Sequence, residues 1–99
     1  MSIILLPPEE FAIKIAARAR ERRLQKGLTQ SGLAHRSGVS LGTLKRFERT
    51  GQIALVSLIR LATALGGEQG LENLFTKREF EKLSDVLEHK KPIKRGRIR

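Results

Sequence analysis

The chain has 99 residues, of which 39% are hydrophobic, so it can build one small domain and is not disordered throughout. Its 20 Lys and Arg against 10 Asp and Glu give a formal net charge of +10 at pH 7, while Cys, Trp and Tyr are absent. This composition excludes disulfide scaffolds and cysteine-ligated zinc or iron–sulfur sites, and it argues against the aromatic stacking platforms of single-strand binders.

The chain begins with a short apolar stretch, Ile3–Leu6, which is far too short to span a membrane. No basic residue precedes it and no small-residue cleavage site follows it, so it lacks the features of a signal peptide. Two alternatives remain open for Met1–Leu6: packing on the subunit's own core, or a strand or arm in a dimer contact. We treat residues 1–7 as an N-terminal apolar arm and expect a cytoplasmic, nucleoid-associated protein that does not contact the membrane.

A first helix is predicted at about residues 8–26. The segment Pro7–Glu10 favours a helix start, because proline suits the first turn and carboxylates there complement the helix dipole. Phe11 and Ile15 begin an apolar row at four-residue spacing, and Gly27 is a natural stop. The helix also carries a run of basic residues, for which a solvated face and contact with flanking phosphates are both open: Arg18, Arg20, Arg22 and Lys26.

Residues 28–51 predict two short helices joined by a tight turn. Thr29 is the N-cap candidate of the first helix, and Gly38 permits the turn that follows it. Ser40 is the N-cap candidate of the second helix, expected at about residues 41–49. Leu44 and Phe47 face inward and anchor this helix, so its opposite face is free. This arrangement is a helix-turn-helix, whose second helix can enter a DNA major groove.

Two or three further helices complete a compact all-α domain of five to six helices. A fourth helix is predicted at about 55–65 and a fifth around Leu71–Phe75, and Thr76 is the N-cap candidate of a sixth. The glycine-rich segment 66–70 lacks the Lys and Ser/Thr of a phosphate-binding loop, so we interpret it as a hinge. The apolar residues behind these predictions are Leu58, Leu61, Ala62, Leu65, Leu71, Leu74, Phe75, Phe80, Leu83 and Leu87.

The charge is distributed in three blocks. Residues 1–66 carry a net +7, residues 67–88 a net −3, and residues 89–99 a net +6 with no acidic group at all. We expect residues 8–88 to form the folded domain, with the helix-turn-helix at 29–50, and residues 89–99 to be a disordered basic tail. For Arg95 and Arg97 in this tail, minor-groove insertion, diffuse phosphate attraction, contact with a protein partner and no role are all open.

The sequence resembles the Xre/Cro/lambda-repressor-type helix-turn-helix regulators over about residues 11–66. The resemblance rests on residues 28–30, 33–34, 38–40, 43–44 and 47–48, followed by Gly51 and Leu58–Leu65. It implies a lambda-repressor-like fold and binding to double-stranded DNA. The whole chain, with its basic tail, also resembles the small antitoxin-type repressors encoded beside Hip-type kinase toxins.

The resemblance also implies roles for individual residues. The positions that match base-facing ones are Leu41, Gly42, Thr43 and Arg46, and those expected at phosphates are Gln30, Ser40, Lys45 and Arg49. Many relatives carry amide or charged side chains where this chain has Leu41 and Gly42, so hydrogen-bonded readout falls mainly on Thr43, Lys45 and Arg46. Arg46 is the best candidate for bidentate pairing to guanine. Arg23 and Glu48 match a family salt bridge that fixes the recognition helix on the scaffold.

The expected function is therefore a sequence-specific transcriptional repressor that binds a palindromic operator as a homodimer and regulates its own operon. The dimer surface is expected in residues 70–88, in Met1–Leu6, or in both. The alternative is an antitoxin subunit that binds a kinase-type toxin protein and also represses its operon. We expect no enzymatic activity and no cofactor, because the sequence has neither a phosphate-binding loop nor a paired nucleophile and base. We expect no metal site, because the only two histidines, His35 and His89, stand far apart in the sequence and there is no cysteine.

Overall fold

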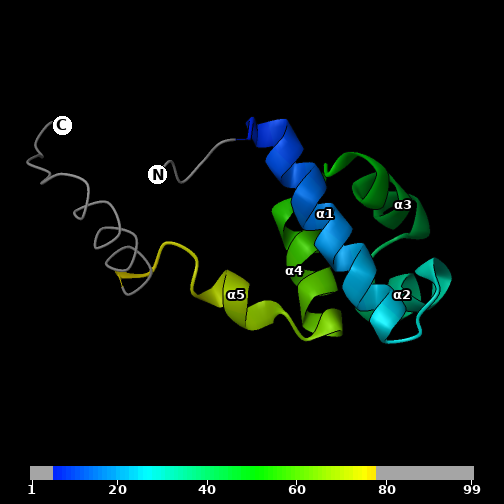
Figure 1. Ribbon diagram of the computed structural model, residues 1–99. Coiled ribbons are helices and arrows are strands. Elements are labelled where there is room, and N and C mark those ends of the chain that lie inside the picture. The colour runs from blue at the N-terminus through cyan, green and yellow to red at the C-terminus, as the bar shows by residue number, and fades with distance from the viewer. Residues whose placement is uncertain (1–5, 78–99) are drawn as a thin grey trace, which may run out of the picture. The chain divides into compact units, whose positions relative to one another are not determined.

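The structure, a computed structural model, describes residues 6–77, and within this range it is all-helical (Figure 1). The prediction of an all-α fold is confirmed. The helices of the described range are α1 (Pro8–Gln25), α2 (Gln30–Ser37), α3 (Leu41–Thr50), α4 (Leu55–Leu65) and α5 (Glu68–Glu72).

The chain separates into two compact units, Met1–Glu68 and Gln69–Arg99. Four of the helices, α1 to α4, lie in the first unit. The predicted sixth helix and the basic tail lie almost entirely outside the described residues, so the boundaries of the arm, domain and tail stay predictions. No helix within residues 6–77 is both long enough and apolar enough to cross a membrane.

Local capping explains where α2 and α3 begin. The Thr29 side-chain oxygen accepts a hydrogen bond of 2.9 Å from the backbone N–H of Gly32, and Ser40 Oγ accepts one of 3.1 Å from the N–H of Thr43. Each hydroxyl satisfies one of the backbone donors that a helix leaves unpaired in its first turn. Both predicted N-caps are therefore confirmed.

The hydrophobic core of the first unit fixes the arrangement of these helices. α1 packs against α3 and α4, and α2 also packs against α3 and α4, so α3 is held from two sides (Figure 1). Phe47 and Leu44 of α3 are almost completely buried, as are Leu33 of α2 and Leu61 of α4. The buried apolar residues of this core are Ala16, Leu33, Val39, Leu44, Phe47, Leu61 and Leu65.

The fifth helix differs from the prediction. It spans Glu68–Glu72, whereas Leu74 and Phe75 lie beyond its end and are exposed. Of the predicted hinge segment 66–70, Gly66 and Gly67 lie between α4 and α5, with Gly66 in the left-handed conformation that ends α4, and residues 68–70 belong to α5. Glu68 favours this start, since a carboxylate in the first turn complements the helix dipole.

The end of α3 depends on a glycine that lies directly against α1. Gly51 has φ +80°, and a Cβ atom there would lie 2.7 Å from the backbone carbon of Ala12 and 2.8 Å from the nitrogen of Ile13. A side chain at position 51 would therefore be strained twice, by its left-handed backbone and by the backbone of α1. The close approach of α3 to α1 requires glycine at this position.

This contact predicts unequal effects of two glycine substitutions. We expect Gly51→Ala to lower the free energy of unfolding by about 3 kcal/mol, because a steric clash adds to the left-handed strain. Gly38→Ala is the matched control, with φ +77° and no atom within 4 Å of the added methyl group, and should cost about 1 kcal/mol. Urea unfolding of both variants measures the difference, and equal losses would contradict the close approach.

Candidate nucleic-acid interface

α2 and α3 are joined by a three-residue turn. Gly38 has φ +77° and caps α2, its N–H donating to the carbonyl of Ala34. Val39 is buried in the core between the two helices, and Ser40 starts α3. The turn therefore contributes a buried contact as well as a change of direction, and it presents the first turn of α3 at the surface.

α3 has one buried face and one exposed face. Leu44 and Phe47 anchor it in the core, and the exposed positions recur at three- and four-residue spacing, so they share one side of the helix. Of the residues expected to face base edges, Gly42 and Arg46 are exposed and Leu41 and Thr43 are half-buried. Of those expected at phosphates, Ser40, Lys45 and Arg49 are exposed and Gln30 is half-buried.

The first turn of α3 is organised by two hydroxyl groups. Ser40 Oγ donates to Thr43 Oγ1 over 2.8 Å while it accepts from the Thr43 backbone N–H. A hydroxyl group has one proton to donate and lone pairs that accept, so Thr43 Oγ1 can take part in this bond and still meet a base edge.

A buried ion pair connects α1 to α3. Arg23 Nε donates to Glu48 Oε2 over 2.8 Å and Arg23 Nη2 donates to Glu48 Oε1 over 3.1 Å, which makes the pair bidentate. The two side chains are only 7% and 5% exposed. Arg23 Nη1 also donates to the carbonyl oxygen of Leu28, over 2.8 Å, and so ties the loop before α2 to the same pair.

Gln30 joins this network at the start of α2. Its Nε2 donates to Glu48 Oε1 over 2.9 Å, so the Glu48 carboxylate holds residues from both helices that pack on α3. The sequence did not predict this contact, because no local pattern relates residues 18 positions apart. The Gln30 amide still has a second N–H, the group that a phosphate oxygen would accept from.

Gln52 is a residue that the sequence analysis missed. Its side-chain oxygen accepts a hydrogen bond from Nη2 of Arg46, the residue expected to pair with guanine. The only sequence signal is its place directly after the glycine that ends α3, because a residue at that position lies next to the last turn of the helix.

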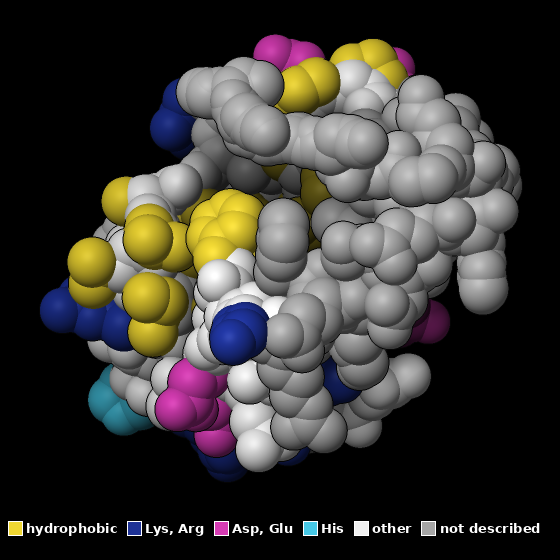
Figure 2. All heavy atoms as spheres, turned by 90° about the vertical axis from the view of Figure 1, so that its left-hand side faces the viewer, with side chains coloured by type: hydrophobic (Ala, Val, Ile, Leu, Met, Phe, Trp, Pro, Cys, Tyr) yellow, Lys and Arg dark blue, Asp and Glu magenta, His cyan; other side chains and the backbone are white. Residues whose placement is uncertain are grey.

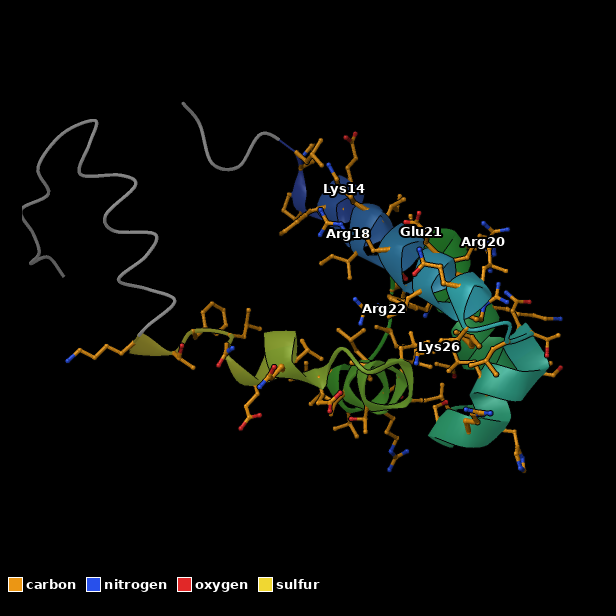
Figure 3. The ribbon with its side chains drawn as sticks, turned by 60° about the horizontal axis from the view of Figure 1, so that its bottom comes forward. Lys14, Arg18, Arg20, Glu21, Arg22 and Lys26 are labelled. Carbon is orange, nitrogen blue, oxygen red and sulfur yellow. The ribbon has the colours of Figure 1, made fainter. Side chains whose placement is uncertain are left out.

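Apart from the buried Arg23, the basic side chains of α1 are exposed, and Figure 3 shows Lys14, Arg18, Arg20 and Arg22 projecting from the helix, with Lys26 just after its end. Glu21 lies among them. A Cβ atom on Gly67 would lie 3.5 Å from Arg22 Nη1, so this guanidinium lies beside the end of α4, where the helix dipole favours a cation. For Arg18, Arg20 and Lys26, phosphate contact and a solvated face stay open.

Two other predictions fall at the edge of the structure or beyond it. Arg95 and Arg97 lie outside the described residues, as does Met1–Leu6 apart from its last residue. Within residues 6–77, no three His, Asp or Glu side chains are grouped so that they could hold a metal ion.

Comparison with known protein families agrees with this geometry. A family model described as helix-turn-helix, of the Xre and lambda-repressor type, matches residues 20–71, slightly more than half of the chain. The match begins near the end of α1 and includes α2, α3 and α4. None of the curated proteins matches the chain.

The ion pair generates a prediction about stability. We expect Glu48→Ala to lower the free energy of unfolding by about 3–5 kcal/mol, because Arg23 would keep a buried charge without its carboxylate. Glu21→Ala removes an exposed glutamate of α1 and should change the free energy of unfolding by less than about 0.5 kcal/mol. Urea and thermal unfolding compare the two variants. A Glu48→Ala protein as stable as the Glu21→Ala protein would show that the pair does not hold the helices together.

Proposed function

Because the chain belongs to the helix-turn-helix family, whose domains bind DNA and regulate transcription, we propose that it is a sequence-specific repressor acting as a homodimer on a palindromic operator in its own promoter. In this proposal α3 lies in the major groove and reads the base edges.

One observation carries the proposal: the exposed face of α3 has only positive charge. Lys45, Arg46 and Arg49 are exposed, whereas Glu48, the one acidic residue of α3, is turned inward to Arg23. A helix that approaches the phosphate backbone gains from such a face, because each neutralised phosphate releases a condensed counterion. The same face also carries the groups that can read bases.

We assign the contacts of this face as follows. Arg46 pairs with a guanine through two of its N–H groups, and the Thr43 hydroxyl bonds to a base edge. The flat surface at Gly42 lets the backbone come close, and Leu41 contacts a thymine methyl group. Phosphate contacts come from Gln30, Ser40, Lys45 and Arg49.

Dimerisation follows from the small size of one recognition helix, which reads only a few base pairs. α4 offers a surface for it, because Leu55, Val56 and Ile59 are 63%, 60% and 42% exposed. Figure 2 shows a face of the molecule on which hydrophobic side chains lie together at the surface. α4 follows α3 after only four residues, so a two-fold contact through its first turns would place both recognition helices beside the symmetry axis.

A second candidate role is that of an antitoxin that binds a kinase-type toxin protein and also represses its operon. Phe75 favours it, being 91% exposed, next to Leu74, within the acidic block of residues 67–88. An exposed aromatic side chain is a common anchor of protein interfaces. Co-expression with the product of the adjacent gene tests this role, and Phe75→Asp should then prevent co-purification of the two proteins.

The DNA-binding proposal predicts the outcome of a selection from a random duplex library. We expect the full chain to enrich a palindromic motif and Arg46→Glu to enrich none, because the reversed charge faces the groove. Lys45→Ala should instead keep the motif and reduce the magnitude of the log–log salt slope by about 1. Circular dichroism checks that the helices are intact. Undiminished enrichment by Arg46→Glu would exclude α3 as the reading helix.

The dimer surface predicts a second, separable effect. Val56→Asp should convert the protein to a monomer in sedimentation analysis, because a charge would enter an apolar contact, and should weaken palindrome binding at least about tenfold. The fold should survive, since Val56 is mostly exposed. Phe75→Asp serves as the matched control in the second unit. If Phe75→Asp dissociates the dimer and Val56→Asp does not, the interface lies in residues 70–88 instead.

A further inference from the structure

The turn that follows α3 is fixed to the last turn of that helix by its own hydrogen bonds. Thr50 Oγ1 donates to the carbonyl oxygen of Arg46 over 2.8 Å, and the same Thr50 oxygen accepts from the backbone N–H of Gln52 over 3.1 Å. Gly51 N–H donates to the carbonyl of Phe47 over 2.7 Å. The backbone of Gln52 is therefore tied directly to the helix that carries Arg46.

The same turn is also fixed from the other side. A Cβ atom at Gly51 would overlap the backbone of α1 at Ala12, so the turn is wedged between α1 and the end of α3. Gln52 thus extends its side chain from a backbone that has little freedom to move. Its partner is not in the core: the side-chain oxygen accepts from Nη2 of Arg46, on the exposed face of α3.

The contact leaves the guanidinium of Arg46 able to read a base. A guanidinium has five N–H groups, and Gln52 accepts from one of them. Four remain, and they include one on each terminal nitrogen, which is the pair that a guanine accepts through O6 and N7. Gln52 therefore does not compete with the base.

We propose that Gln52 is a positioning residue for specificity: it orients Arg46 toward a single base pair in the major groove. This inference rests on the proposed function, since it assigns a cause to the preference at one position of the operator. An exposed hydrogen bond of this kind adds little to the stability of the fold. Ordering the side chain in advance lowers the cost of binding, which corresponds to about a threefold to tenfold effect on affinity for the preferred base pair.

The test compares binding profiles of full-length variants on the motif that the wild-type protein enriches from a random duplex library. Each base pair of the motif is changed in turn and the dissociation constants are measured. Arg46→Ala identifies the base pair that depends on Arg46. Gln52→Ala should lower the preference at that same base pair about threefold to tenfold and leave the other positions unchanged. Gln52→Glu keeps an acceptor for Arg46, so it should keep the preference while its added charge weakens binding uniformly.

Two controls separate positioning from other roles. Gln25→Ala removes an exposed glutamine at the end of α1 and should leave the profile unchanged. In the Arg46→Ala background, Gln52→Ala should have no further effect on base preference, because its target is gone. An unchanged Gln52→Ala profile, a loss that is equal at all positions, or an effect that persists without Arg46 would each overturn the inference. Failure of the wild-type protein to enrich any motif would instead overturn the proposed function itself.

Discussion

The arrangement of the first unit depends on the buried ion pair between Arg23 and Glu48. One carboxylate accepts from a guanidinium on α1 and from the Gln30 amide at the start of α2, so α3 is held against both helices by charge-assisted hydrogen bonds as well as by apolar packing. Breaking such a pair on one side leaves a charge with little access to water. The geometry of α3 therefore does not rest on the small core alone.

The pair also shapes the electrostatics of the surface. Glu48 is the acidic residue of α3, and it pairs with Arg23 in the interior. The charged groups that α3 exposes to solvent are therefore all basic. The total charge of +10 is weaker evidence for DNA binding at α3, because 6 units of it lie in residues 89–99. The local arrangement of α3 gives the stronger reason to place DNA at this face.

Much of this could be predicted from the sequence, for identifiable reasons. α2 and α3 were located because Thr29, Ser40 and Gly38 act through local backbone chemistry, which sequence patterns encode directly. The Arg23–Glu48 pair was expected through resemblance to relatives. The contacts of Gln30 and Gln52 were not predicted, since they depend on where two separate elements meet. α5 was misplaced because three apolar residues, Leu71, Leu74 and Phe75, were taken to mark the helix, whereas Leu74 and Phe75 follow the helix and are exposed.

The two faces of α3 have different roles. Leu44, Phe47 and Glu48 hold the helix in place, while Gly42, Lys45, Arg46 and Arg49 make no contribution to the buried core. Substitutions on the outer face therefore change what is read without loosening the scaffold. A chain built in this way is evolvable: duplicated copies can diverge toward new operators one side chain at a time and remain folded at every step.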